Sequence, residues 1–214
     1  MNVSPSKENI LKRIRQALSH PVPVPFPGSE GNNSVFQPPA DDLAVQFAQE
    51  FTRLNGKFLF CADLQEAAVQ LQQLFQVRQW SKVVCKEQTL SDALQSSVPG
   101  GSFYAQLNDC DVSVTGCEAL VSRTGSVVLS TAPASGRTTS VYAPVHICIA
   151  HSSQLVYDIK DALSLIKDRY ADRLPSLISF ATGPSRTADI EKTLVVGVHG
   201  PKEVFVILVE EPFS

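Results

Sequence analysis

Two glycine- and hydroxyl-rich loops carry the side chains best suited to chemistry in this chain of 214 residues. The first loop spans residues 112–137 and contains three glycines, which permit tight backbone turns. Its serine and threonine hydroxyls accompany Arg123 and Arg137, whose guanidinium groups are forked hydrogen-bond donors. Because such donors suit a carboxylate or a phosphate, this loop predicts an anion-binding site.

Glu118 is the one acidic side chain between Asp111 and Ile147. A lone carboxylate among hydroxyls and cations is what proton abstraction or acyl transfer would use, which makes Glu118 a catalytic candidate. A solvated loop residue is the simpler interpretation. We favour the solvated residue because no partner base can be located in the sequence.

The second loop, residues 182–202, begins with a Gly-Pro turn. Ser185 and Thr187 can cap a helical turn predicted over residues 189–192, and Arg186 projects from the start of that turn. A helix N-terminus has free amide groups and attracts anions, so an arginine and two hydroxyls beside it predict a second anion site. Asp189 can balance this charge or hold Arg186 in place.

His199 lies in a glycine-rich turn between Gly197 and Gly200. A histidine in such a turn can serve as an acid, a base or a pH-sensitive group. It can equally hydrogen-bond the backbone of the turn, and the sequence leaves both roles open.

Metal and redox motifs are absent from the sequence. The five cysteines are an odd number without a CxxC pair, which argues against a disulfide framework, a zinc ribbon and a ferredoxin-type cluster. We interpret each cysteine as a small buried hydrophobe. His146 and His151 flank a predicted strand five positions apart, and this odd spacing places them on opposite faces. We therefore predict structural histidines, and no metal or cofactor in this chain.

Composition restricts the partners. The chain has 21 acidic and 18 basic residues, so it lacks the basic excess typical of nucleic-acid binding. No run approaches the roughly 20 apolar residues of a membrane helix, and the first residues lack the apolar core of a signal peptide. These features predict a cytoplasmic protein that binds neither nucleic acid nor membrane.

An arm and a linker are predicted before the body of the protein. Residues 4–19 form an amphipathic helix with Ile10 and Ile14 on its apolar face, and packing on the body or on another subunit is favoured over a membrane. Residues 20–40 contain six prolines and form an extended linker. The expected division is residues 1–39 for arm and linker and 40–214 for one domain, with a homo-oligomer as an open possibility.

Helical and strand patterns alternate in the body, which is typical of α/β proteins. Helices are predicted over residues 41–54, 63–79, 87–95 and 157–174. Strands are predicted over residues 57–62, 80–85, 111–114, 144–150, 177–181 and 204–209. Residues 119–122 and 126–130 flank a tight turn and form a hairpin set into the sheet. The predicted fold is a three-layer α/β/α sandwich around a mostly parallel mixed sheet.

The strings GPSRTADIE and GVHGP in the second loop, and SRTGSVVLS in the first, closely resemble the LUD-domain family of lactate-utilisation proteins in its short LutC-like form. The resemblance runs from about residue 40 to 209. It implies a fold similar to the group of ribose-5-phosphate isomerase, glucosamine-6-phosphate deaminase and CoA-transferase. The pocket residues that it implies are Thr124, Gly125, Ser126, Arg137, Gly183, Ser185, Arg186, Thr187, Asp189, His199 and Gly200.

The same resemblance implies a part in the oxidation of L-lactate to pyruvate beside iron–sulfur oxidoreductase subunits. Because this chain lacks cysteine clusters, we expect the iron–sulfur clusters only in partner subunits. We expect the chain itself to be an accessory or ligand-binding subunit that takes a small anionic metabolite. The alternative is a stand-alone isomerase or CoA/acyl transferase for a phosphorylated or carboxylate metabolite, with Glu118 or Asp189 as base or nucleophile.

Overall fold

The computed structural model describes residues 5–19, 42–190 and 193–210. The chain divides into two units, residues 1–38 and 39–214. In the first unit α1 (Pro5–Leu18) is helical, inside the predicted range, and Ile10, Leu11 and Ile14 are exposed on it. Residue 4 of the predicted helix and the proline-rich linker lie outside the described residues. None of the described helices is long and apolar enough to cross a bilayer.

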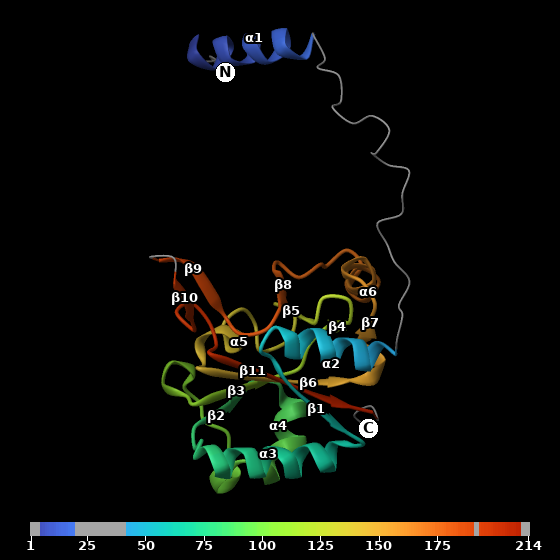
Figure 1. Ribbon diagram of the computed structural model, residues 1–214, viewed down its shortest axis with the longest axis vertical. Coiled ribbons are helices and arrows are strands. Elements are labelled where there is room, and N and C mark those ends of the chain that lie inside the picture. Colours follow the sequence, from blue (N-terminus) through green and yellow to red (C-terminus); the bar gives the residue numbers. More distant parts are fainter. Residues whose placement is uncertain (1–4, 20–41, 191–192, 211–214) are drawn as a thin grey trace. The chain divides into compact units, whose positions relative to one another are not determined.

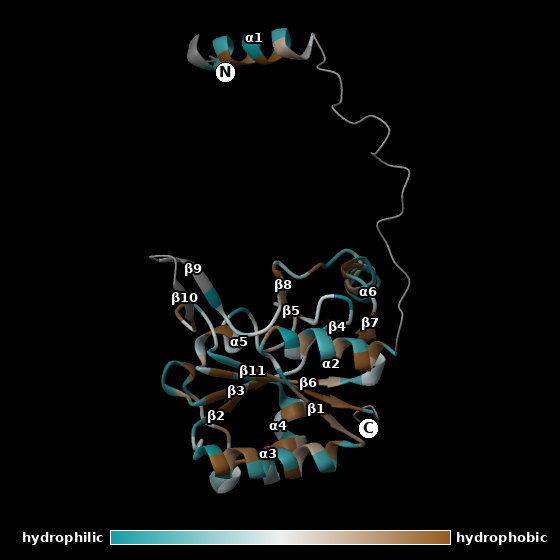
Figure 2. Ribbon diagram, in the orientation of Figure 1, coloured by the Kyte–Doolittle hydropathy of each residue, from teal (hydrophilic) through white to brown (hydrophobic). Residues whose placement is uncertain are grey.

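A five-stranded parallel sheet lies at the centre of the second unit (Figure 1). Its strand order is β1-β11-β6-β3-β2. The strands are β1 (Lys57–Cys61), β2 (Val83–Cys85), β3 (Val112–Thr115), β6 (Val145–His151) and β11 (Glu203–Val209). Every residue of β6 is buried, as expected for a central strand covered on both faces. The predominantly brown strands in Figure 2 show the same apolar character.

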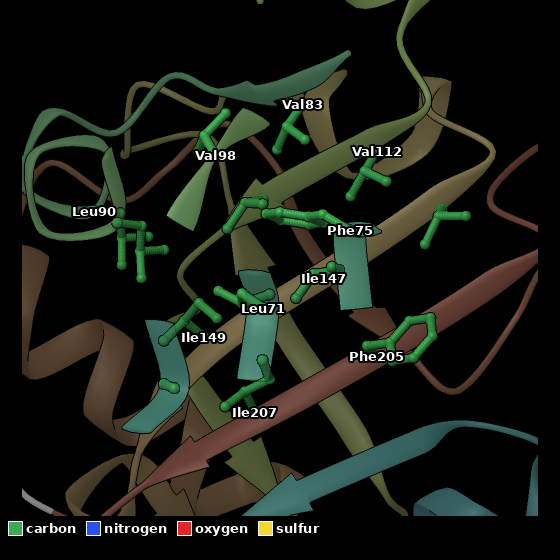
Figure 3. Close-up of a cluster of buried hydrophobic side chains, with 14 of the residues drawn as sticks. Leu71, Phe75, Val83, Leu90, Val98, Val112, Ile147, Ile149, Phe205 and Ile207 are labelled. Atoms are coloured by element: carbon green, nitrogen blue, oxygen red, sulfur yellow. The ribbon is translucent and has the colours of Figure 1, made fainter. Parts of the chain in front are cut away.

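Alternate residues of the strands face two different cores. Phe205 and Ile207 of β11 point toward one cluster, whereas Val204 and Val206 point toward the other. On the first face lie α3 (Leu64–Arg78) and α4 (Gln88–Leu94). Leu71 and Phe75 of α3 pack there against Ile147 and Phe205 (Figure 3). The predicted inward face of this helix is thereby confirmed at those two positions.

The opposite face is covered by α2 (Leu43–Arg53) and by a second sheet. Asp42 caps α2 by accepting hydrogen bonds from the Ala44 and Val45 amides at 2.8 and 3.3 Å. The second sheet has the order β7-β4-β5-β8. Its strands are β4 (Ala119–Val121), β5 (Ser126–Ser130), β7 (Leu155–Val156) and β8 (Ile178–Ala181), and α6 (Ile159–Tyr170) packs on its outer side.

The predicted hairpin is present, but its place in the fold differs from the prediction. Strands β4 and β5 pair antiparallel, as predicted, yet they join the second sheet and not the parallel one. Leu120 faces the cluster of α2, whereas Ala119 and Val121 face α6. Because the hairpin is apolar on both faces, it needs a packed layer on each side. The α/β class with a mostly parallel sheet and covering helices is confirmed.

The segment after Ser185 contradicts the predicted helical turn at residues 189 and 190, whereas residues 191 and 192 of that turn lie outside the described residues. It forms β9 (Arg186–Ile190), paired antiparallel with β10 (Thr193–Val196). The Gly197 amide donates to the Ser185 carbonyl at 3.0 Å, and the Ser185 amide donates to the Pro201 carbonyl at 3.0 Å. These long-range backbone bonds extend the segment and outweigh the local capping signal of Ser185.

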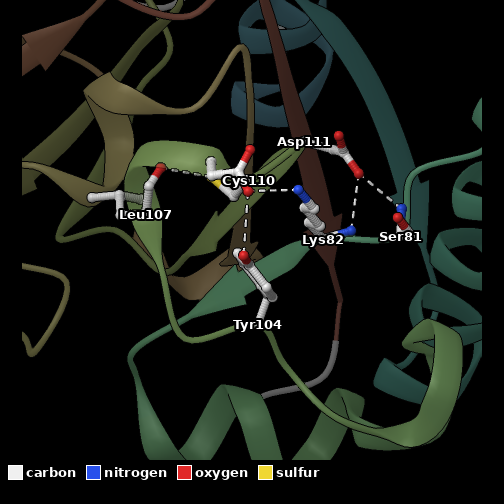
Figure 4. A network of polar contacts seen from close by, with 7 residues as sticks. Ser81, Lys82, Tyr104, Leu107, Cys110 and Asp111 are labelled. Carbon is white, nitrogen blue, oxygen red and sulfur yellow. Dashed lines mark hydrogen bonds and ion pairs between the residues drawn. The ribbon is translucent and has the colours of Figure 1, made fainter.

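A polar network fixes the loop before β3 (Figure 4). Asp111 accepts hydrogen bonds from the Ser81 and Lys82 amides, each at 2.9 Å. The Lys82 ammonium pairs with Asp109 at 2.6 Å, which lowers the pKa of Asp109.

The remaining helical elements are α5 (Thr139–Tyr142) and short 3-10 turns at Gln95–Ser97, Pro99–Gly101, Leu107–Asp109 and Ser152–Gln154.

Candidate functional site

Several residues of the second loop line one cavity of about 270 Å³, which we call the His199 cavity. It lies near the amino ends of β6 and β11, which contribute His146 and Val204 to its wall. The polar or glycine residues around it are Ser140, His146, Ser179, Thr182, Gly183, Ser185, His199 and Gly200. The structure therefore brings four predicted site residues together, Gly183, Ser185, His199 and Gly200.

A groove of about 480 Å³ adjoins this cavity and shares Val141, His199 and Gly200 with it. We call it the Val198 groove. Gly200 allows the two chain segments to approach closely, because a Cβ there would lie 2.9 Å from the Cβ of Ser185. Lys202 lies on the groove wall, and its amide donates to the Pro144 carbonyl at 2.8 Å.

The polar side chains beside this region are available for a ligand. Neither Lys202 nor His199 takes part in an ion pair within the part of the chain that the structure describes. Glu203, which follows Lys202, pairs instead with Lys57 and Arg78. An exposed ammonium and an imidazole beside a hollow with hydroxyl groups form an arrangement that can hold a small anion.

His146 forms the buried wall of the His199 cavity. It is 1% exposed, and its Nε2 lies 2.8 Å from the hydroxyl of Thr115. Burial lowers its pKa to about 4, so the ring is neutral near pH 7 and offers a hydrogen bond without a charge. The prediction that His146 and His151 lie on opposite faces of the strand is confirmed. His146 lies on the α2 side of β6, whereas His151 alternates with the α2-facing residues and so shares the α3 side.

The tip of the first loop lies against α2. Gly125 has a φ of +59°, and a Cβ at this residue would lie 2.5 Å from the backbone nitrogen of Phe51. The hydroxyl of Ser126 bonds those of Thr124 and Thr182, at 2.7 and 2.8 Å. This part of the loop therefore joins the second sheet to α2. Thr124, Gly125 and Ser126 do not line the His199 cavity, whereas Thr182, the partner of Ser126, does.

The three predicted arginines each have a different partner, and Arg123 pairs with Asp158 at 2.7 Å. The Arg186 guanidinium donates to the carbonyl of Leu54, at the end of α2, and no helix N-terminus lies beside it. The Arg137 guanidinium donates to the Ser176 hydroxyl at 2.9 Å. Neither Arg186 nor Arg137 lines the His199 cavity. Thr187 and Asp189 belong to β9, and their side chains lie outside what the structure describes.

Glu118 lines a different cavity, of about 240 Å³, near the carboxyl ends of β2, β3 and β6. We call it the carboxyl-edge cavity. The favoured interpretation of Glu118 as a solvated loop residue is wrong, because the side chain is buried. Its carboxylate accepts hydrogen bonds from Ser130 at 2.5 Å and Tyr170 at 2.8 Å, and it pairs with Arg169 at 2.5 Å. Burial and the bond to Glu118 raise the pKa of Tyr170.

Glu87 lies on the same cavity and was not singled out from the sequence. Its carboxylate accepts the Gly116 amide at 3.1 and 3.2 Å and the Ser135 hydroxyl. Arg169 and Tyr170 were also missed as partners of Glu118. One signal was present in the sequence, since Tyr170 is on the predicted inner side of a helix and a buried tyrosine hydroxyl needs a partner.

Comparison with known proteins identifies related chains. A family model described as LUD domain matches residues 86–209. Lactate utilization protein C of Bacillus licheniformis is 40% identical over 114 residues, which are 52% of this chain and 48% of that protein. Its namesake in Bacillus subtilis is 38% identical over 114 residues, with the same coverage. The chain thus spans about half the length of the curated relatives it matches.

One further relative and one solved structure complete the comparison. An uncharacterized protein of Neisseria meningitidis is 31% identical over 99 residues, 46% of this chain and 42% of that protein. The crystal structure of a DUF162 family protein from Deinococcus radiodurans matches with a TM-score of 0.52 and 17% identity, over 78% of this chain and 96% of that one. At this identity the structural match shows the shared fold alone.

Proposed function

Because this chain belongs to the LUD domain family, we propose that it acts in lactate utilisation as an accessory or ligand-binding subunit of a system that oxidises L-lactate to pyruvate. The observation that carries this proposal is the 38–40% identity to two proteins named lactate utilization protein C. The matched segment includes both loops and the cavities described above.

The ligand of this subunit is a small carboxylate in the His199 cavity. Lys202 supplies a positive donor in the adjoining Val198 groove, and His199, Ser185 and the neutral His146 supply polar groups on the wall of the cavity. Lactate and pyruvate each carry a carboxylate beside a second oxygen. A cation together with neutral hydrogen-bonding groups suits such a pair of oxygens.

The electrons from lactate pass to other subunits in this proposal. Oxidation of the hydroxyl carbon releases an electron pair and two protons, and no CxxC cluster motif in this chain could hold an iron–sulfur acceptor. Iron–sulfur oxidoreductase subunits are therefore the proposed partners, and the present chain binds or positions the ligand for them.

Growth on lactate tests this role directly. A strain that lacks the protein should fail to grow on L-lactate as sole carbon source and should still grow on pyruvate. The wild-type chain and Lys167→Met, a change on the exposed side of α6, should restore growth, whereas Lys202→Met should restore it poorly. Normal lactate growth of the deletion strain would overturn the proposal.

Co-purification tests the proposed partners. The tagged full chain, isolated from cells grown on lactate, should bring down proteins that contain iron and acid-labile sulfide. The matched preparation from cells grown without lactate should bring down less. A chain that elutes without iron from both cultures would refute a complex with iron–sulfur subunits.

The comparisons do not favour a stand-alone isomerase or CoA/acyl transferase. No relative named above carries such an activity in its name, and the carboxylate of Glu118 already has three partners.

A further inference from the structure

Two cysteines of this chain are neighbours across the parallel sheet. In the pairing of β3 with β6, Thr115 lies opposite Cys148, and Cys117 follows two residues after Thr115. Cys117 packs against the apolar cluster that contains Cys148. The thiol of Cys148 contacts the Ile149 carbonyl at 4.0 Å, and both Cys117 and Cys148 are free cysteines.

The two thiols differ in their access to solvent. Cys117 is half-buried and lies on the wall of the carboxyl-edge cavity. Cys148 is fully buried, and the neighbouring Cys117 thiol together with burial raises the pKa of Cys148 well above the ordinary value. A small oxidant that enters the cavity therefore meets Cys117 first, because Cys148 does not line it.

The other cysteines have different surroundings. Cys110 donates to the Leu107 carbonyl at 3.1 Å in the network of Figure 4, and Cys85 contacts the Glu87 carbonyl at 3.6 Å. Cys61 is buried at the end of β1. Burial raises the pKa of each of these three thiols, which disfavours their reactive thiolate form.

We propose that Cys117 and Cys148 form a peroxide-responsive thiol pair, in which Cys117 is oxidised first and Cys148 resolves it to an intrachain disulfide. The sulfur of Cys117, as thiolate, attacks one oxygen of a hydroperoxide. An S–O bond forms and the O–O bond breaks, and the second oxygen takes the proton that the Cys117 thiol released, so that it leaves as an alcohol, or as water if the oxidant is hydrogen peroxide. This step leaves a sulfenic acid on Cys117.

Cys148 then attacks the sulfur of Cys117. The S–S bond forms, the S–O bond breaks, and the hydroxyl leaves as water with the proton of Cys148. In sum, two thiols give up one electron pair to the peroxide. Cys117 lies two residues beyond Thr115, the partner of Cys148 in the strand pairing, so the loop after β3 has to hold the two Cα atoms within the range of about 4.4–6.8 Å that a disulfide requires.

The disulfide would tie the loop that carries Glu118 to the central strand β6. Cys117 is already held from the other side, because its carbonyl accepts the Gln154 side-chain amide at 2.5 Å. The next residue, Glu118, donates its amide to the Val128 carbonyl at 2.8 Å. The link would therefore join the parallel sheet to the second sheet covalently.

Thiol counting on the purified full chain tests this pair. After treatment with hydrogen peroxide and alkylation with iodoacetamide in denaturant, three of the five cysteines should be labelled, and reduction should restore all five. Peptide mapping should find Cys117 linked to Cys148. Cys61→Ala, which removes another buried thiol, should leave this link intact.

Two variants separate the steps. In Cys148→Ala the sulfenic acid of Cys117 should persist and react with dimedone. In Cys117→Ser, a change at a half-buried position, neither the disulfide nor the dimedone adduct should form. The proposal is overturned if the wild-type chain keeps five thiols, if a different pair is linked, or if the disulfides join separate chains.

Discussion

The two cavities at opposite ends of the parallel strands use their charged groups differently. In the carboxyl-edge cavity Glu118 is 1% exposed and is bonded by Arg169, Tyr170 and Ser130. In the His199 cavity and the adjoining groove, Lys202 and His199 form no ion pair within the described residues. A buried carboxylate has to be paired to be tolerated, whereas an exposed cation does not.

This difference separates structural from binding roles. The bonds of Glu118 reach from the loop after β3 to the end of α6, so they hold the second sheet and its helix together. His199 and Lys202 form no ion pair within the described residues, so their side chains remain available to bind a ligand. The buried carboxylate of Glu118 is therefore assigned to stability, and the exposed ammonium of Lys202 to the proposed carboxylate ligand.

The largest expected effect is that of Glu118→Ala on stability. Its removal leaves Arg169 and Tyr170 without their acceptor, which should lower the free energy of unfolding by about 3 kcal/mol, since Arg169 is 43% exposed and can still reach water. Urea unfolding measures this loss. Asp168→Asn, on the exposed face of the same helix, should change stability by less than about 0.5 kcal/mol. Equal stability of the two variants would show that the Glu118 network does not hold the fold.

The second effect concerns the contribution of His146 to folding stability and its dependence on pH. Its folded-state pKa of about 4 lies below the ordinary 6.5, so the unfolded chain takes up the proton first as the pH falls. The contribution of His146 to stability is complete above pH 6.5 and is lost as the pH falls toward 4. The loss should reach about 2 kcal/mol at pH 5.

The variant His146→Gln has no charge to gain and should remove this loss. Unfolding free energies at pH 7 and pH 5 provide the measurement, and His199→Gln, at an exposed position, serves as the control that keeps the wild-type dependence. A wild-type pH dependence in His146→Gln would mean that another group is responsible.

The third effect concerns binding by the exposed cation. Lys202→Met should weaken the binding of L-lactate or pyruvate about fivefold to tenfold, the loss of one charged hydrogen bond of roughly 1 kcal/mol at an exposed site. Calorimetric titration of the purified chain measures the affinity, with Lys167→Met as the matched control. An unchanged affinity in Lys202→Met would remove this residue from the site.

The smallest effect is expected for Arg137→Ala. Because this guanidinium bonds Ser176 and does not line the His199 cavity, its removal should change the affinity for the same ligands by less than about twofold. The same titration distinguishes an Arg137 that only bonds Ser176 from an Arg137 that lines the ligand pocket. A strong loss of affinity in Arg137→Ala would restore the sequence-based prediction that this arginine lines the pocket.

Local patterns predicted the elements of the body well. Apolar runs located β6 and β11, helical periodicity located α3 and α6, and the short turn located the β4–β5 hairpin. The error over residues 189–192 has a local cause, since Ser185 and Thr187 have the residue types of helix caps. The bonds that make the segment a hairpin come from Gly197 and Pro201, which no local pattern reveals.

The candidate site shows the same limit in a stronger form. The sequence identified His199, Ser185 and Glu118 as polar groups in informative loops, because residue type and spacing suffice for that. It could not show that Glu118 meets Arg169 and Tyr170 more than fifty positions later, or that Gly125 packs on the backbone of α2.

The sequence by itself determined the α/β class, the order of the elements and the family resemblance, since these depend on residue periodicity and on contiguous strings. The tertiary structure alone decided which charges are paired, which cysteines belong to the same apolar cluster and which loop residues share a cavity. The physical reason is that burial and pairing are properties of contacts between distant segments. Those contacts exist only once the two sheets and their helices have packed together.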